Sequence, residues 1–387
     1  MTKWDWLERP PVPYTPGFLL RVLVKAALLF AALNAAFALL DPLPALGQLS
    51  LYNRLFPGRP RLPYGEDPAR SYNLSLWNLN AMLESHEVAR PKAPDELRVL
   101  VMGDSSVWGV LLRPDETLAA YLNAGGYVAP DGRTMRFYNL GHPIMALTKD
   151  LMLLDAAMVY RPDLILWPVT LQSFPRRQQL EAPLVQHNAA AVRRLIAAYD
   201  LALDPADPRL LDESFLDKTL VGRRRDLADL LRLQLYGAAW AATGIDQFYP
   251  ETYDLRRSDF EPDAAWQGLA PETGLPEDFL AWDVVEAFFA RAGDVPVLLV
   301  NEPVFISSGQ NSDLRYNFWY PRWAYDAYRS RLFERAQANG WPVLDVWDAI
   351  ASDEFTDSPV HLTPAGSRRL ADLIAPVLLE TPTGEGF

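Results

Sequence analysis

The sequence contains no cysteine among its 387 residues. This absence excludes disulfide bonds, thiolate nucleophiles, cysteine-ligated zinc and cysteine-linked lipid. The absence of cysteine does not decide the cellular compartment, because an exported protein need not contain disulfides. Lysine and arginine are outnumbered, at 36 against 49 Asp and Glu, and the formal net charge is −13. No basic cluster stands out, so we expect no nucleic-acid partner, since that binding depends on Lys and Arg meeting phosphates.

Sequence motifs of several enzyme classes are also missing. The chain contains no Gly-x-Ser-x-Gly elbow, no Gly-x-Gly-x-x-Gly, no Walker loop and no His-Glu-x-x-His. These patterns hold nucleophiles, nucleotide phosphates or zinc, so we expect neither a cofactor nor a metal. Half of the residues are hydrophobic and 22% are charged, a composition typical of a folded protein with a sizeable core.

One long hydrophobic run is present, over residues 18–40, interrupted by Arg21, Lys25 and Asn34. As a helix it would be about 34 Å long, enough to cross a hydrocarbon core of about 30 Å. We expect a single-pass membrane anchor. A buried core helix is disfavoured because Ala and Leu surround the whole circumference. A cleavable signal peptide is disfavoured by the long lead and the lack of a clear cleavage site before Asp41.

Basic residues around this run favour a cytoplasmic N-terminus. Those at or before its start are Lys3, Arg9, Arg21 and Lys25, and those after it are more distant, at Arg54, Arg59, Arg61 and Arg70. Because cytoplasmic flanks carry the excess of Lys and Arg, we predict a tail over 1–17, the anchor over 18–40, a proline-rich neck over 41–96 and a main domain over 97–380. The main domain would lie outside the cell membrane.

The main domain alternates short apolar runs with amphipathic segments. Strands are predicted at 97–102, 135–140, 163–169, 296–300 and 342–346, and helices at 116–123, 146–160, 281–292, 324–339 and 364–379. Nearly continuous apolar strands separated by helices indicate a parallel sheet covered on both faces. The fold class is therefore α/β, doubly wound, with the site at the carboxyl ends of the strands. Residues 171–294 are too long for one crossover and form a predicted insertion or cap, partly helical.

The first predicted strand runs into Gly-Asp-Ser-Ser at 103–106. This sequence places Ser105 at a sharp turn into a helix, where its hydroxyl is exposed and backbone N–H groups share the same space. Such geometry suits a nucleophile. Asp and Ser are also preferred helix caps, so these residues alone do not decide the function.

The far end of the chain supplies the partners that a serine nucleophile needs. Asp357 and His361 share one short loop before the last helix. The carboxylate can hold one imidazole nitrogen while the other faces a serine hydroxyl. Of the four histidines, His361 alone has a nearby acid in a loop after the last strand.

Four blocks in this order resemble the SGNH, or GDSL, hydrolase family. They are GDSS at 103–106, NLGHP at 139–143, the segment after PDLILWPV, and the Asp and His beside HLTPAG. The resemblance covers residues 97–379, apart from the insertion, and implies a flavodoxin-like three-layer α/β/α fold. It implies Ser105 as nucleophile, His361 as base and Asp357 as orienting acid. The backbone N–H groups of Ser105 and Gly141 would bind the oxyanion.

The sequence departs from the family pattern at two places. Where the family has Gly-x-Asn-Asp, this chain has Thr-Leu-Gln-Ser at 170–173, so Gln172 stands in for the asparagine that donates to the oxyanion. The family's acid precedes the histidine by three residues, a position held here by Ser358, whereas Asp357 precedes it by four. Loss of one oxyanion donor costs roughly a hundred- to a thousandfold in rate.

A polar and aromatic stretch follows the fourth predicted strand, over residues 300–329. Its position suggests that Glu302, Asn311 and Arg315 bind substrate, together with His142 beside Gly141. The alternative is a packed loop in which these side chains satisfy buried groups.

These features predict a membrane-anchored serine esterase or O-acyltransferase. Its substrate would be an acyl ester, with an envelope or extracellular polysaccharide as one candidate glycan acceptor. The alternative, favoured by Gln172 and the shifted Asp357, is an inactive SGNH-like binding or assembly module.

Overall fold

The computed structural model describes residues 14–56, 58–65, 71–249, 251–252 and 254–380. The chain forms two compact units. The smaller comprises the chain up to Pro44 together with Glu213–Ala228, and the larger comprises Ala45–Asp212 and Asp229–Phe387. Of the predicted tail, residues 1–13 lie outside the described residues, and so do Lys3 and Arg9.

The smaller unit is built on one long helix, α1 (Pro16–Leu40). Its first turn is capped by Thr15, whose hydroxyl accepts the Phe18 N–H at 3.2 Å. The buried residues of α1 are Asn34 and Ala38. A core helix would be buried along a whole stripe, whereas within the smaller unit the burial of α1 is confined to its last two turns. By length and composition, α1 is able to cross a membrane.

Residues 213–228 are attached to the end of α1 by polar contacts. Asn34 Oδ1 accepts the N–H of Val221 at 3.0 Å, and Lys218 forms an ion pair with Asp41 at 3.1 Å. Both contacts lie within the smaller unit.

The larger unit contains a five-stranded parallel sheet. Its strands are β1 (Glu96–Val101), β2 (Thr134–Asn139), β3 (Leu164–Val169), β4 (Val297–Asn301) and β5 (Val343–Asp345), in the order β2-β1-β3-β4-β5. Each end lies within one residue of the predicted strand. The parallel register pairs Leu100 with Tyr138 on one side and with Ile165 on the other.

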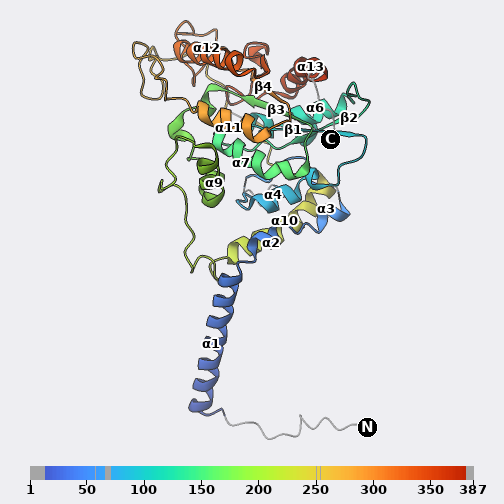
Figure 1. Ribbon diagram of the computed structural model, residues 1–387, viewed down its shortest axis with the longest axis vertical. Helices are drawn as coiled ribbons and strands as arrows, with labels where there is room; N and C mark the ends of the chain where they lie inside the picture. The colour runs from blue at the N-terminus through green and yellow to red at the C-terminus, as the bar shows by residue number, and fades with distance from the viewer. Residues whose placement is uncertain (1–13, 57, 66–70, 250, 253, 381–387) are drawn as a thin grey trace. The chain divides into compact units, whose positions relative to one another are not determined.

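Helices cover both faces of this sheet, as Figure 1 shows. One core contains Leu100 and Met102 together with side chains of α4 (Leu79–Ser85), α7 (Leu147–Ala157), α9 (Ala189–Tyr199), α11 (Trp282–Ala292) and α12 (Arg322–Asn339). The other contains Val99 and Val101 with side chains of α6 (Leu118–Ala124) and α13 (Pro364–Glu380). Because alternate residues of a strand point to opposite faces, β1 contributes to both cores. The α/β fold predicted from the sequence is confirmed.

The remaining helices are short or belong to the insertion. They are α2 (Leu43–Gly47), α3 (Tyr52–Leu55), α5 (Ser105–Trp108), α8 (Pro183–Gln186), α10 (Arg224–Thr243) and several single 3-10 turns. The strand order reverses direction at β1, with β2 on one side and β3 on the other. In such sheets the crevice for ligands opens at the carboxyl ends of the strands beside this reversal. Helix α5 begins four residues after β1, at that edge.

Candidate active site

A sharp turn after β1 positions Ser105 at the first residue of α5. Gly103 has φ +144°, and a Cβ there would lie 2.7 Å from the Val107 side chain. Glycine is therefore required where the strand turns back toward the helix. Asp104 caps α5, since its Oδ1 accepts the N–H of Ser106 at 2.8 Å. These constraints leave the Ser105 side chain partly exposed, while its neighbours Gly103 and Asp104 are buried.

The structure brings Ser105 and His361 together from opposite ends of the larger unit. His361 Nε2 lies 2.9 Å from Ser105 Oγ, and His361 Nδ1 lies 2.8 Å from Asp357 Oδ1. The three side chains form a continuous serine–histidine–aspartate relay. In this geometry the carboxylate orients the ring, and the second nitrogen can take the hydroxyl proton.

The loop that carries Asp357 and His361 is closed on itself. Phe355 pairs with Leu362 in an antiparallel bridge, and the Thr356 N–H donates to the His361 carbonyl at 2.9 Å. This closure restores contact across the four-residue spacing. Ser358, at the position where the family has its acid, is buried and accepts the Val360 N–H instead.

The pKa of Asp357 is below its ordinary value. Its half-buried position would raise the pKa, but the hydrogen bond and the charge of His361 outweigh that effect. The carboxyl is therefore ionised at neutral pH, as an orienting acid must be.

Lys149 joins the loops that follow β1 and β2. It is completely buried on α7, and its ammonium donates to the Gly103 carbonyl at 2.9 Å and to the His142 carbonyl. Asp150 Oδ1 lies 3.1 Å from the same nitrogen. A buried cation with three oxygen partners fixes the position of Gly103 relative to His142. No motif in the sequence singles out Lys149, although a Lys-Asp pair in a largely apolar helix is a visible signal.

A second buried contact lies beneath the turn. Ser106 Oγ is 2.5 Å from Glu302 Oε2, and Glu302 Oε1 has no hydrogen-bond partner among the described residues. Burial, followed by the charge of Asp104, raises the pKa of Glu302 well above its ordinary value. Glu302 thus contacts the residue beside Ser105, and its role in substrate binding stays a prediction.

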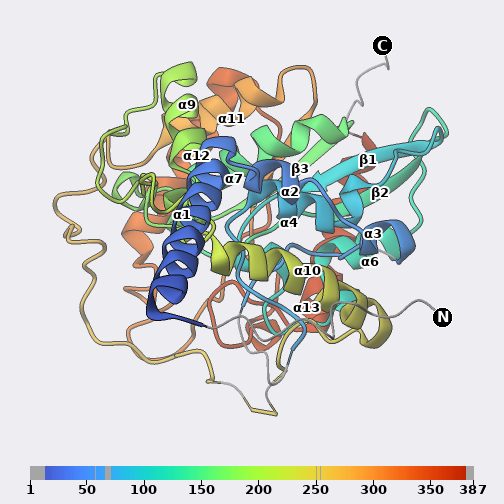
Figure 2. The same cartoon turned by 90° about the horizontal axis from the view of Figure 1, so that it is seen from below.

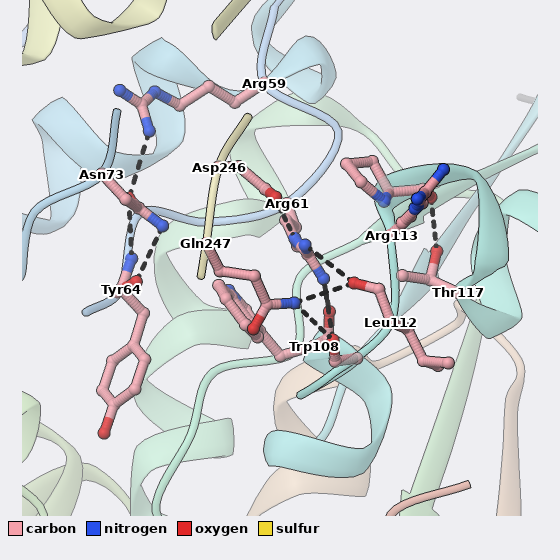
Figure 3. Close-up of polar contacts among 12 residues, drawn as sticks. Arg59, Arg61, Tyr64, Asn73, Trp108, Leu112, Arg113, Thr117, Asp246 and Gln247 are labelled. Atoms are coloured by element: carbon pink, nitrogen blue, oxygen red, sulfur yellow. Dashed lines mark hydrogen bonds and ion pairs between the residues drawn. The ribbon is translucent and has the colours of Figure 1, made fainter. Parts of the chain in front are cut away.

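Arg61, from the predicted neck, contacts the far end of α5. Its Nη1 donates to the carbonyls of Trp108 at 3.1 Å and Gly109 at 2.9 Å, and its Nε pairs with Asp246 (Figure 3). Its Nη2 donates to the carbonyl of Leu112 at 3.0 Å. The last carbonyls of a helix lack partners within the helix, so a buried arginine from residues 58–65 satisfies those of α5.

The two other predicted oxyanion donors make hydrogen bonds elsewhere. The Gly141 N–H donates to Asn139 Oδ1 at 3.1 Å, and the Gln172 side-chain amide donates to Gln178 Oε1 at 3.3 Å. Neither is hydrogen-bonded to Ser105 within the described chain. The Ser105 N–H, at the first position of α5, has no acceptor among the described residues.

The remaining predicted substrate-binding residues make hydrogen bonds with backbone carbonyls. His142 is buried, its Nδ1 lies 3.1 Å from the Pro143 carbonyl, and burial followed by the charge of Lys149 lowers its pKa to about 3. Arg315 donates to the carbonyls of Asn317, Asp263 and Phe318, and Asn311 donates to that of Phe260. Asn311 and Arg315 therefore connect their loop to residues 260–263, and a role of these side chains in substrate binding stays a prediction.

Among the described residues, no group of three or more His, Asp or Glu side chains is arranged to hold a metal ion.

No protein-family model matches the chain, and no curated protein matches it in sequence. Several solved structures resemble it at low identity. A protein described as lipolytic and of the G-D-S-L family, from Desulfitobacterium hafniense, is 11% identical with a TM-score of 0.34, over 73% of this chain and 99% of that one. A carbohydrate acetylesterase family member from Sinorhizobium meliloti is 12% identical, with a TM-score of 0.31 and coverages of 73% and 99%. The aryl esterase of M. smegmatis is 12% identical, with a TM-score of 0.33 and coverages of 73% and 98%.

Proposed function

We propose that this chain is a membrane-anchored serine hydrolase of the SGNH type that acts on acyl esters through an acyl-serine intermediate. The observation that carries the proposal is the relay of hydrogen bonds from Ser105 through His361 to Asp357, at 2.9 and 2.8 Å. The residues come from positions 256 apart in the sequence. Its formation at the carboxyl end of β1 agrees with where such folds bind ligands.

The geometry supports a two-step reaction. The Ser105 hydroxyl transfers its proton to His361 Nε2 as Oγ bonds to the ester carbonyl carbon, and Asp357 stabilises the imidazolium. The carbonyl oxygen becomes an oxyanion, which the Ser105 N–H at the start of α5 stabilises. The carbon–oxygen bond to the alcohol then breaks, and the alcohol leaves with the proton from His361. In the second step His361 accepts a proton from water as the water oxygen bonds to the acyl carbon; the bond from that carbon to Ser105 Oγ then breaks, the carboxylic acid leaves, and the proton returns from His361 to Ser105.

The acceptor in the second step decides between two activities. Water makes the protein an esterase, and a sugar hydroxyl makes it an O-acyltransferase of an envelope or extracellular polysaccharide. Both activities use the same relay and the same intermediate. An assay with an acetylated glycan as donor and a free glycan as acceptor separates the two activities. Release of free acid identifies the esterase, and acylation of the free glycan identifies the transferase.

The membrane anchor in this proposal is α1. Its apolar side chains are exposed around the helix, and its length matches the hydrocarbon core of a bilayer. Asn34 and Asp41 are bonded to Val221 and Lys218, which supports retention of α1 rather than its removal as a signal peptide. The preferred orientation places the larger unit on the extracytoplasmic side of the membrane. Resistance of the full chain to extraction from membranes by alkaline carbonate tests the anchor.

A second candidate function is a non-catalytic binding or assembly module. The observation that favours it is the engagement of Gly141 and Gln172 in other hydrogen bonds, which leaves the oxyanion with fewer donors than the family uses. A fluorophosphonate probe with short-chain p-nitrophenyl esters discriminates the two functions. We expect the wild-type chain to be labelled and to turn over ester.

The variants Ser105→Ala and His361→Ala should reduce turnover by roughly 10⁴- to 10⁶-fold, and Ser105→Ala should abolish labelling. Ser106→Ala is the matched control, because the adjacent hydroxyl contacts Glu302 rather than His361. A folded wild-type chain that neither labels nor turns over ester contradicts the hydrolase and supports the module.

A further inference from the structure

Two segments of the larger unit expose leucine side chains on neighbouring surface. The six exposed leucines in residues 45–56 and 229–245 are Leu46, Leu49, Leu51, Leu55, Leu231 and Leu235, called here the leucine patch. The exposed fractions are 80% for Leu55, 66% for Leu51, 62% for Leu231 and 61% for Leu235. Isolated exposed leucines are ordinary, whereas a contiguous apolar patch marks an interaction surface.

Hydrogen bonds hold the two segments side by side. Gln234 Oε1 accepts the N–H of Leu51 at 2.8 Å, and Gln234 Nε2 donates to the carbonyl of Leu49 at 3.3 Å. Figure 2 shows α3 and α10 next to one another. Leu231 and Leu235, on either side of Gln234, therefore lie close to Leu49 and Leu51.

The part of α10 within the larger unit is apolar on two faces. Leu233, Gly237 and Trp240 are buried, and the Arg59 guanidinium lies 4.4 Å from the centre of the Trp240 ring. Leu231 and Leu235, four residues apart, project from an uncovered face. A helix that is apolar on both faces is normally covered on both. The covered face belongs to the domain, and the leucine patch requires another apolar partner.

The charge of the two segments fits an apolar partner rather than a charged one. Residues 45–56 contain one charged residue, Arg54, and residues 229–245 contain two, Asp229 and Arg232. Arg232 pairs with Asp229 at 2.7 Å. The two segments thus carry a net charge of +1, the sum of +2 and −1, in a chain of net charge −13.

The covalent chain keeps the leucine patch near the membrane end of α1. Leu46 is six residues beyond Leu40, so at about 3.6 Å per residue it lies at most about 22 Å from the end of α1. The second connection is of similar length. Val221 is bonded to Asn34 of α1, and Leu231 follows Val221 by ten residues, most of which are helical and therefore rise only about 1.5 Å each. Two of the three connections between the units, at 44–45 and 228–229, enter the larger unit beside the leucine patch, and the third is at 212–213.

We infer that the leucine patch docks on the bilayer that α1 spans, with its side chains in the headgroup and upper acyl region. Apolar helix faces of this kind lie about 5–10 Å into that boundary. The partner is the lipid surface itself, and the docking holds the larger unit against the membrane. This inference rests on the proposed membrane anchor and is independent of the hydrolase activity.

The absence of cysteine allows a direct test in the full chain. Leu235→Cys, with Leu51→Cys as a second position, would be labelled with an environment-sensitive fluorophore and reconstituted into vesicles of phosphatidylcholine and phosphatidylglycerol. Phe333→Cys is the control, because Phe333 is partly exposed on α12, across the larger unit from α10 (Figure 1). Quenching by lipids with a nitroxide near the headgroup reports contact with the bilayer. Thermal unfolding of each labelled variant confirms that it is folded.

We expect strong quenching of the labels at positions 235 and 51 and little at 333. The quenching should persist at about 1 M salt, where the Debye length is ~3 Å and charge attraction is screened. Equal quenching at 235 and 333 in vesicles that carry the chain overturns the docking and leaves the anchor intact. A label at 235 that is shielded from aqueous iodide but not quenched by lipid also overturns it, since a second copy or another protein then covers the patch. A chain that does not float with the vesicles overturns both the anchor and the docking, while fluorophosphonate labelling tests the hydrolase separately.

Discussion

At the residue scale, contact between side chains matters more than their spacing in sequence. Asp357 is one residue further from the histidine than the family pattern requires, yet its carboxylate lies 2.8 Å from His361 Nδ1. The closed loop from Phe355 to Leu362 makes this possible. The serine at the family's usual position, Ser358, caps a backbone N–H and contributes nothing to the relay.

This assignment predicts different effects for two neighbouring substitutions. Asp357→Asn should lower kcat by roughly 10²- to 10⁴-fold, because an amide cannot stabilise the imidazolium or select the tautomer. Ser358→Ala should leave kcat within a few-fold of wild type. Steady-state hydrolysis of a p-nitrophenyl ester measures both. A larger loss for Ser358→Ala than for Asp357→Asn would show that the acid is misassigned.

Lys149 illustrates a residue that acts through the backbone. Replacing it by Met leaves the carbonyls of Gly103 and His142 and the carboxylate of Asp150 without their cation. Removing one partner of a buried pair costs about 3–5 kcal/mol, so we expect Lys149→Met to lower the unfolding free energy by that amount and kcat more than KM. Lys92→Met, at a partly exposed pair with Asp163, should cost less than about 1 kcal/mol. Similar denaturation midpoints for the two variants would contradict this role.

At the element scale, the turn between β1 and α5 depends on a backbone shape that only glycine adopts easily. Gly103→Ala combines a positive φ with a Cβ 2.7 Å from the Val107 side chain. Gly132→Ala also has a positive φ, at +87°, but no atom within 4 Å of the new Cβ. Strain of this kind costs about 1–3 kcal/mol.

We therefore expect Gly103→Ala to be less stable than Gly132→Ala and to lose most of the proposed esterase activity, because the clash moves Ser105. Thermal unfolding and kcat/KM of the two variants provide the comparison. Equal losses of stability with full activity in both would mean that the turn does not fix the position of Ser105.

The elements themselves were largely predictable from the sequence. The apolar runs at 97–102 and 163–169 identified β1 and β3 within one residue, because buried parallel strands are apolar on both faces. The pairing of Ser105 with His361 was expected from the Asp and His in the loop before the last helix and from the resemblance to the SGNH family. The directions of side chains could not be predicted in this way. Arg61 and Asp246 lie 185 residues apart, and no local pattern indicates that they meet at the end of α5.

Gly141 and Gln172 show the same limit within the site. Each stands at the position that the family pattern assigns to an oxyanion donor, and the chain topology brings both segments to the edge of the sheet. The Gly141 N–H donates to Asn139, and the Gln172 side-chain amide donates to Gln178. Both acceptors are close in sequence, but the hydrophobic periodicity of the chain does not indicate such side-chain contacts.

At the scale of the whole molecule, the buried carboxyl of Glu302 links folding to pH. Burial and the charge of Asp104 raise its pKa well above the ordinary value, despite the hydrogen bond with Ser106. The folded chain therefore holds a proton that the unfolded chain releases once the pH exceeds the ordinary value of glutamate. Stability must then fall as pH rises, by up to about 1.4 kcal/mol per pH unit from this one group, until the raised pKa is reached.

Glu302→Gln removes this dependence and keeps an oxygen that accepts the Ser106 hydroxyl. We expect the variant to have a stability close to wild type near pH 5 and to be progressively more stable than wild type toward pH 8. Urea denaturation of both full-length chains in detergent, at several pH values, measures the difference. Asp150 is present in both proteins, so its own titration largely cancels from the comparison. A difference in unfolding free energy that stays constant from pH 5 to pH 8 would mean that Glu302 is ionised in the folded chain. Ser106, in the turn that carries Ser105, would then donate its hydrogen bond to a buried carboxylate.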